Sequence, residues 1–151
     1  MEIINIKKDC DFLNEYIKLC SIEWSKPKTK EEMTKYIEEK KESILTGDKV
    51  ISILGLTENN KLIGFISLFK YDGDERLDLT PWYATMYVKK EFRDKGYSKL
   101  LNDAILSEAF DLGYDKVYLK SSLKNYYEKF GAIFIEKLNN GESLFYINLK
   151  K

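Results

Sequence analysis

The chain has 151 residues, 44% hydrophobic and 33% charged, a length and composition that predict one globular, water-soluble domain over residues 1–151. Its 25 basic and 25 acidic side chains give zero formal net charge, which argues against a general nucleic-acid-binding protein because such a protein needs surplus Lys and Arg on one face. There is no histidine, so Ser-His-Asp and Cys-His catalysis and histidine metal sites are excluded, and proton transfer must use Tyr, Asp, Glu, Lys, Cys or water.

The N-terminal segment predicts a short strand followed by a helix. Residues 2–8 alternate as in a strand and lack the basic start and apolar core of a signal peptide. Asp9 is a good helix N-cap, and apolar residues follow at helical spacing. Cys10 and Cys20 fall in this helix, where ten residues separate Cα atoms by roughly 15 Å, too far for a disulfide. We therefore expect two reduced core thiols, no membrane span and a cytoplasmic protein.

A second helix and a hairpin come next. Thr29 and Glu32 form a capping-box pattern, and Gly47 is placed to end the helix that they begin. Residues 50–56 and 62–71, joined by a turn at 57–61, read as an antiparallel hairpin.

The second half of the chain alternates strands with helices. After a charged loop at 72–78, the expected elements are strands at 82–88, 115–120, 132–137 and 143–150, a helix from about residue 97, and a short helix within 122–131. In the helix from residue 97, the positions expected to face inward are Leu100, Leu101, Ala104, Ile105 and Leu112.

This order, β-α-α-β-β-β-α-β-α-β-β, predicts an α/β fold with one mixed sheet flanked by helices. Strands 82–88 and 116–120 are joined by a crossover helix, so we expect them to be parallel neighbours with a right-handed connection. A site is then expected at the carboxyl ends of these two strands.

The turn at residues 93–98, Arg-Asp-Lys-Gly-Tyr-Ser, lies between a strand and an amphipathic helix. Gly96 has no Cβ to block a phosphate, and backbone N–H groups from Lys95 to Lys99 would point along the helix axis toward an anion. Arg93 adds a positive charge and Ser98 a hydroxyl. A pyrophosphate would fit this turn, although the pattern is loose and also fits a solvated helix cap.

Three segments in this order resemble the GCN5-related N-acetyltransferase (GNAT) superfamily: YVKKEFRDKGYSKLL, LGYDKVYLK and NYYEKFGAIFIE. The first is similar to that family's acetyl-CoA signature. Ser98 stands where Gly or Ala is usual and Ala132 where an aromatic residue is frequent. The resemblance implies a single GNAT-like domain with a mostly antiparallel central sheet and a parallel pair at the cofactor cleft.

It further implies that acetyl-CoA is the donor and that a primary amine of a small molecule or peptide is the acceptor. No metal is expected, because the sequence has no histidine and no metal-ligand spacing of its two cysteines. The pantetheine arm would pair like a strand with Met86, Tyr87 and Val88, and a backbone N–H there would stabilise the oxyanion. The complete set of expected cofactor-binding residues is Met86, Tyr87, Val88, Arg93, Asp94, Lys95, Gly96, Tyr97, Ser98 and Lys99.

Tyr127 matches the family's tyrosine, which the resemblance implies is the general acid that protonates the leaving thiolate. A phenol has a pKa near 10 and is protonated at neutral pH. The alternative is that Tyr127 only packs beside Phe130. Asp78 and Glu23 are candidate bases, but a water chain would serve equally well.

Trp24, Trp82 and Tyr83 are candidates to line the acceptor pocket, with aromatic core packing as the alternative. No nucleic acid or membrane partner is expected, and the C-terminal strands could pair across a homodimer. Two other functions remain open: a non-catalytic acyl-CoA sensor, and an acyltransferase using a different acyl group.

Overall fold

The computed structural model describes residues 1–73 and 75–149. Asp74, in the predicted loop, and Lys150, in the predicted last strand, lie outside the described residues. In chain order the elements are β1 Glu2–Asn5, a 3-10 turn Ile6–Lys8, α1 Cys10–Trp24, α2 Lys30–Thr46, β2 Val50–Glu58, β3 Lys61–Phe69, β4 Trp82–Val88, a 3-10 turn Lys90–Phe92, α3 Tyr97–Asp111, β5 Lys116–Ser121, a 3-10 turn Tyr127–Phe130, β6 Ile133–Lys137 and β7 Ser143–Asn148.

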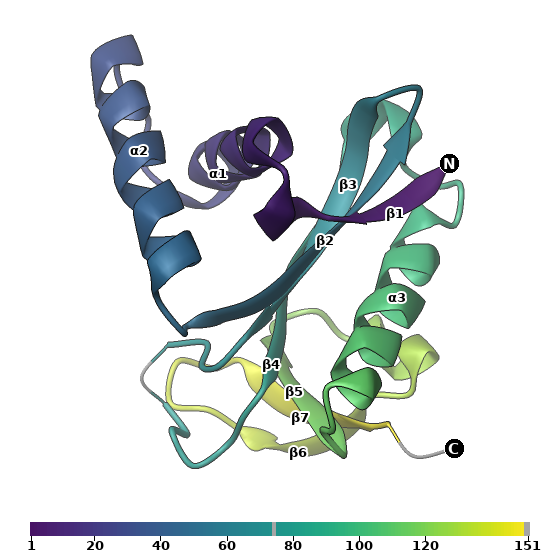
Figure 1. Ribbon diagram of the computed structural model, residues 1–151. Helices are drawn as coiled ribbons and strands as arrows, with labels where there is room; N and C mark the ends of the chain where they lie inside the picture. The colour runs from purple at the N-terminus through teal and green to yellow at the C-terminus, as the bar shows by residue number, and fades with distance from the viewer. Residues whose placement is uncertain (74, 150–151) are drawn as a thin grey trace.

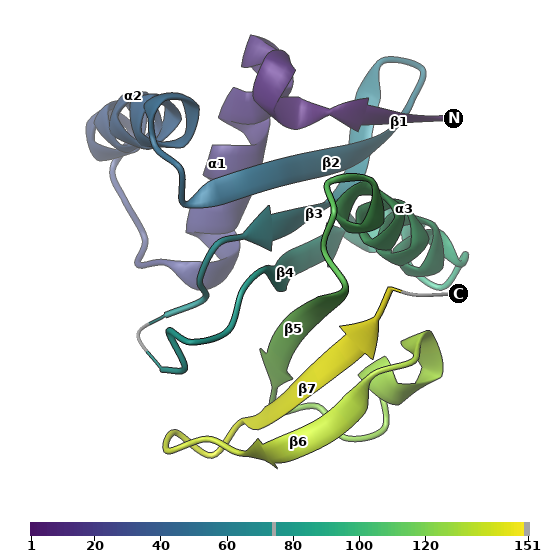
Figure 2. The ribbon, with the colours of Figure 1, turned by 60° about the horizontal axis from the view of Figure 1, so that its bottom comes forward.

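The strands form one seven-stranded sheet in the order β1-β2-β3-β4-β5-β7-β6. Every neighbouring pair is antiparallel except β4 and β5, which are parallel. The predicted mixed sheet, and the parallel pair in it, are therefore confirmed. Helices α1 and α2 cover one face of the sheet and α3 covers the other (Figures 1 and 2).

Each face of the sheet has its own hydrophobic cluster, because successive strand residues point to opposite faces. Under α3, Leu101 and Ile105 pack on Ile63, Ile66 and other buried residues of the sheet. On the opposite face a second cluster joins α1 and α2 to the sheet through Leu13, Tyr16, Ile44, Ile53 and Phe65, among others.

Local sequence signals account for the starts of the two N-terminal helices. The Asp9 carboxylate accepts a hydrogen bond from the Phe12 N–H at 3.1 Å. At α2 the capping box is complete, with Thr29 N–H donating to the Glu32 carboxylate at 2.9 Å and Glu32 N–H donating to the Thr29 hydroxyl at 3.1 Å. These predicted helix starts are confirmed.

Some local predictions were wrong. The first strand ends at Asn5, whose side chain accepts from Lys7 N–H and starts a 3-10 turn instead. Leu100 and Leu112 are 48% and 53% exposed, so they do not face the core. By contrast, the short helix predicted within 122–131 is present as the 3-10 turn Tyr127–Phe130, which begins after Asn125 (φ +58°) and ends at Gly131 (φ +92°).

The two thiols differ, since Cys10 is exposed and only Cys20 is partly buried; the prediction of a core position for Cys10 was therefore wrong. Burial raises the pKa of the Cys20 thiol to about 12. A high pKa leaves almost no thiolate at pH 8, and the thiolate is the reactive form.

We expect an aromatic disulfide reagent to label only the exposed Cys10 rapidly in the native protein, and to label both thiols rapidly in denaturant. Equally rapid native labelling of both would contradict the burial of Cys20.

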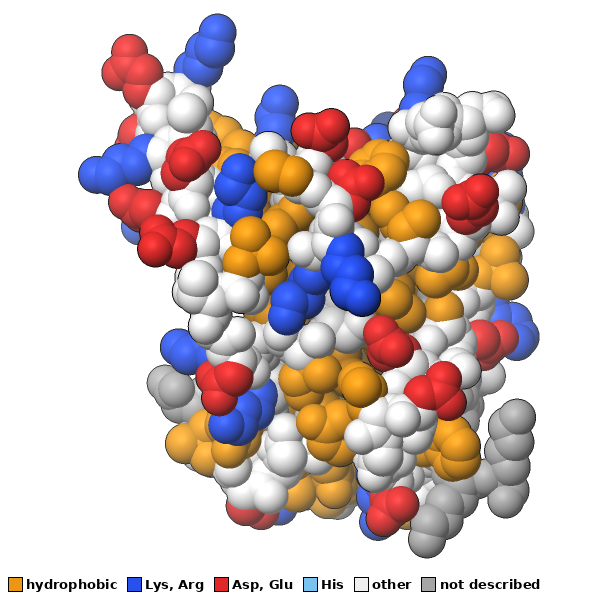
Figure 3. Space-filling view, viewed as in Figure 1, with side chains coloured by type: hydrophobic (Ala, Val, Ile, Leu, Met, Phe, Trp, Pro, Cys, Tyr) orange, Lys and Arg blue, Asp and Glu red, His pale blue; other side chains and the backbone are white. Residues whose placement is uncertain are grey.

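On the face in Figure 3, acidic and basic side chains are interspersed, and neither charge covers an extended area. Within the described part of the chain, no helix combines the length and the apolar character needed to span a membrane.

At one edge of the sheet, β6 exposes Ile133, Phe134 and Ile135. A homodimer through these C-terminal strands stays a prediction.

Candidate functional site

A cleft of about 750 Å³ opens where β4 and β5 separate. The two strands share one residue pair, Trp82 with Tyr118, at the start of β4, and no later pair joins them in the described chain. Beyond that point their backbones diverge toward the carboxyl ends. The lining comes from the end of α1, from β4, from the connection between β4 and α3, from the start of α3 and from the segment after β5. Its residues are Glu23, Trp24, Met86, Tyr87, Val88, Phe92, Arg93, Asp94, Gly96, Tyr97, Ser98, Lys99, Leu123, Tyr126, Tyr127, Lys129 and Phe130.

One end of the cleft is the N-terminus of α3. Gly96 is the N-cap, with φ +81°, and no described side chain caps this helix. The first N–H groups of a helix have no partner within it, so those after Gly96 are available to an anion. A Cβ built on Gly96 would have no atom within 4 Å, which shows that the space beside the turn is open. These features fit a phosphate group.

Basic side chains around this turn have distinct positions. Arg93 Nε donates to the Val88 carbonyl oxygen at 2.7 Å, and its guanidinium lies 5.6 Å from the Tyr87 ring centroid. Arg93 thereby ties the turn to the end of β4. Lys99 lines the cleft and pairs with Asp103 at 2.8 Å on the exposed helix surface. Lys95 lies over Phe92 and is the single expected cofactor-binding residue outside the lining.

The floor of the cleft is the end of β4. Tyr87 and Val88 pair with Phe65 and Gly64 of β3 on one side, while the other side of β4 has lost its pairing with β5. At Gly64 an added Cβ would lie 2.5 Å from the Tyr87 carbonyl oxygen, so the absence of a side chain permits this close strand approach. An extended ligand arm can lie along the unpaired side.

Tyr127, in the wall of the cleft, lies against two other tyrosines. Its ring is edge-on to Tyr126, with centroids 4.8 Å apart, and edge-on to Tyr83 at 6.0 Å. Burial is the main cause that raises the pKa of Tyr127 above its ordinary value, and Tyr126 adds to it. The phenol therefore keeps its proton at neutral pH and can donate it.

Tyr83 supports this arrangement from within the core. It is 3% exposed and does not line the cleft. Its hydroxyl donates to the Asn102 side-chain oxygen at 2.5 Å, which fixes the ring that Tyr127 packs against. Tyr83 thus contacts Tyr127 without reaching the open space.

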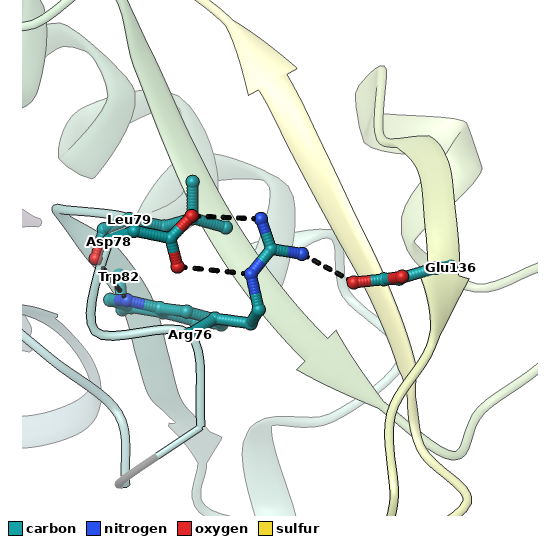
Figure 4. A network of polar contacts seen from close by, with 5 residues as sticks. All are labelled: Arg76, Asp78, Leu79, Trp82 and Glu136. Carbon is teal, nitrogen blue, oxygen red and sulfur yellow. Dashed lines mark hydrogen bonds and ion pairs between the residues drawn. The ribbon is translucent and has the colours of Figure 1, made fainter.

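Trp24 and Trp82 occupy opposite environments. Trp24 is 53% exposed, lines the cleft beside Glu23 and lies edge-on to Tyr87 at 6.3 Å. Trp82 is 1% exposed and packs against Leu138 and Leu144 outside the cleft. Its indole N–H donates to the Leu79 carbonyl oxygen at 2.9 Å (Figure 4). The position of Trp82 gives no support to contact with an acceptor.

Asp78, one candidate base, also lies outside the cleft. Two hydrogen bonds of 3.0 Å join its carboxylate to Arg76, which also pairs with Glu136 (Figure 4). The hydrogen bonds from Arg76 lower the pKa of Asp78, which makes its carboxylate a weaker base. Glu23 is the candidate base that the fold brings to the cleft.

Several lining residues were not expected from the sequence. Tyr126 lines the cleft, and Lys129 Nζ lies 4.0 Å from its ring centroid. Tyr126, Lys129 and Phe130 belong to the segment that carried the resemblance, so their proximity to Tyr127 in sequence was the available signal. Phe92 lies in the first segment that carried the resemblance, whereas Leu123 lies outside all three segments and had no comparable signal. In residues 1–73 and 75–149, no group of three or more His, Cys, Asp or Glu side chains lies close enough to hold a metal ion.

The model of the acetyltransferase (GNAT) family matches residues 13–132. No curated protein sequence matches significantly.

Three of the similar solved structures illustrate the match, which extends over nearly the whole chain. An N-acetyltransferase from Staphylococcus aureus Mu50 shares 19% identity, with a TM-score of 0.69 and coverage of 99% of this chain and 100% of the other. The PaiA N-acetyltransferase from Thermoplasma acidophilum, in complex with coenzyme A, shares 20% identity. Its TM-score is 0.65, and the match covers 98% of this chain and 99% of the other. An aminoglycoside 6'-N-acetyltransferase complexed with coenzyme A shares 14% identity. Its TM-score is 0.73, and the match covers 100% of this chain and 98% of the other. At these identities the shared property is the fold.

Proposed function

Because the chain belongs to the acetyltransferase (GNAT) family, we propose that it transfers an acetyl group from acetyl-CoA to a primary amine of a small molecule or peptide. The observation that carries the proposal is the cleft itself. It combines an uncapped helix N-terminus at one end, the unpaired side of β4 along its floor and the Tyr127 phenol in its wall. These are an anion site, a strand-like binding edge and a proton donor.

Each part has a role in the proposed reaction. The N–H groups after Gly96 and the Arg93 charge hold the diphosphate, and the edge formed by Met86, Tyr87 and Val88 holds the pantetheine arm. A backbone N–H of this edge donates to the thioester oxygen as it gains charge.

The amine nitrogen attacks the thioester carbon, so that a C–N bond forms and the C–S bond breaks. Tyr127 donates its proton to the departing thiolate. Water returns to Tyr127 the proton that the amine releases.

The charges next to the cleft favour acceptors that carry few positive charges. Within the cleft the carboxylates of Glu23 and Asp94 are matched by Lys99 and Lys129, since the charge of Arg93 is assigned to the diphosphate. A neighbouring pocket at the α1–α2 turn is lined by Lys18, Lys26, Lys28 and Lys30, with no carboxylate among its described lining residues. Positive side chains repel a polycation, whereas the aromatic wall of Trp24, Tyr87 and Tyr126 suits an apolar body.

We test function and acceptor charge together by measuring coenzyme A thiol release at saturating acetyl-CoA with phenethylamine, a short neutral peptide, spermidine and an aminoglycoside. The monoamines are expected to give kcat/KM about tenfold or more above the polyamines, and the difference should shrink at high salt. Fastest turnover of spermidine would contradict the charge argument alone. Coenzyme A binding without thiol release from any amine would favour the non-catalytic sensor.

A further inference from the structure

Thr85 interrupts β4 with an unusual backbone conformation. Its φ is +51°, in the left-handed region that β-branched residues rarely enter. At the same place the register with β3 shifts: Ser67 faces Ala84, whereas Phe65 faces Tyr87. Two steps along β3 therefore match three along β4, which is a β-bulge with an extra residue in β4.

A line of hydroxyl groups that runs into the core holds this residue. Thr85 Oγ1 donates to Ser67 Oγ at 2.5 Å, and Ser67 Oγ lies 2.7 Å from the Tyr16 hydroxyl. Ser67 is 0% and Tyr16 4% exposed, so water does not compete for the Ser67–Tyr16 bond, and the Thr85–Ser67 bond is partly buried. The Tyr16–Ser67–Thr85 chain thus runs from α1, through β3, to the bulge in β4.

The bulge lies directly before the part of β4 that lines the cleft. It follows the one β4–β5 pair, at Trp82, and directly precedes Met86, where the cleft-lining edge of β4 begins. A strand bends and twists more strongly at a bulge, so the conformation of Thr85 sets the direction of the backbone that follows. Strained backbone persists only where its surroundings hold it.

We infer that the Tyr16–Ser67–Thr85 chain is a positioning device for the donor, and this inference rests on the proposed function. Its hydrogen bonds keep Thr85 in the left-handed conformation, and that conformation aims the backbone of Met86 to Val88 at the thioester arm. Thr85, Ser67 and Tyr16 are positioning residues, because they act through this backbone and do not line the cleft.

Three substitutions of Thr85 separate this role from simple packing. Thr85→Ser keeps the hydroxyl and should stay within about twofold of the native affinity for coenzyme A, measured by calorimetry. Thr85→Val keeps the shape, loses the hydrogen bond and should weaken that affinity about tenfold, because nothing then holds the left-handed conformation. Thr85→Gly also loses the hydroxyl, but it adopts positive φ without strain and should bind more tightly than Thr85→Val.

Adenosine 3',5'-bisphosphate is the control ligand, because it has no pantetheine arm to meet β4. Its affinity should be the same in all three variants. Ser67→Ala and Tyr16→Phe should reproduce the loss of coenzyme A affinity in smaller degree. Circular dichroism and thermal unfolding establish that each variant is folded.

The order of the three Thr85 variants in coenzyme A affinity decides the inference. If Thr85→Val binds coenzyme A as well as or better than Thr85→Gly, Thr85 fills space and the inference is overturned. Equal losses for both ligands would also overturn it, because they would indicate a general effect on the fold. If the native protein binds coenzyme A but turns over no amine, the proposed function fails while the binding comparison still decides this inference. If the native protein binds no coenzyme A, both fail.

Discussion

Replacing Gly96 by aspartate is expected to reduce coenzyme A affinity at least about 100-fold, because it places a carboxylate where the diphosphate would lie. The fold should survive. Aspartate is among the residues that tolerate positive φ, and a Cβ at this position meets no atom within 4 Å. Calorimetric titration of the native and variant proteins with coenzyme A measures the change.

Gly96→Asn is the matched control, since asparagine has the same size and tolerates the same backbone conformation but carries no charge. It should bind coenzyme A more tightly than Gly96→Asp. Thermal unfolding of both variants should be close to that of the native protein. Native affinity in a folded Gly96→Asp variant would show that the diphosphate does not lie at the start of α3.

Replacing Tyr127 by phenylalanine should lower kcat by about 10²-fold, the lower end of what a positioned general acid contributes, and change coenzyme A affinity little. The variant keeps the ring that packs against Tyr83 and Tyr126 and removes only the proton donor. Single-turnover measurement with the best acceptor of the amine panel, beside calorimetry with coenzyme A, separates chemistry from binding. Tyr126→Phe is the control, with a smaller effect expected.

The pH dependence has a defined sign. Burial raises the pKa of Tyr127 above the ordinary value near 10, so the protonated, donating form persists to higher pH than that of a free phenol. The native kcat should therefore not fall on the alkaline side below pH 10 through loss of this proton. Turnover by Tyr127→Phe that equals the native value, or an equal loss in Tyr126→Phe, would reject the acid role of Tyr127.

The family and the architecture were predictable because their signals are local and occur in order. The strand, the glycine turn and the amphipathic helix around Gly96 are contiguous, and so are the residues around Tyr127. The Asp9 cap bonds to Phe12 and the Thr29 capping box to Glu32, each pair three residues apart, and such short-range patterns form wherever the backbone permits. The roles of the individual site residues stay predictions, to be decided by the experiments above.

By itself, the sequence determined the element order, the parallel β4–β5 pair and the turn at the start of α3. Only the tertiary structure decided which aromatic residues reach the cleft, because Trp24 and Trp82 both follow plausible patterns but only Trp24 lies at an open surface. It also decided that Leu100 faces outward and that Thr85 forms a bulge held by Tyr16 and Ser67. Burial and strand register depend on which distant segments pack together, and residues as far apart as 16 and 85 carry no sign of that in their local pattern.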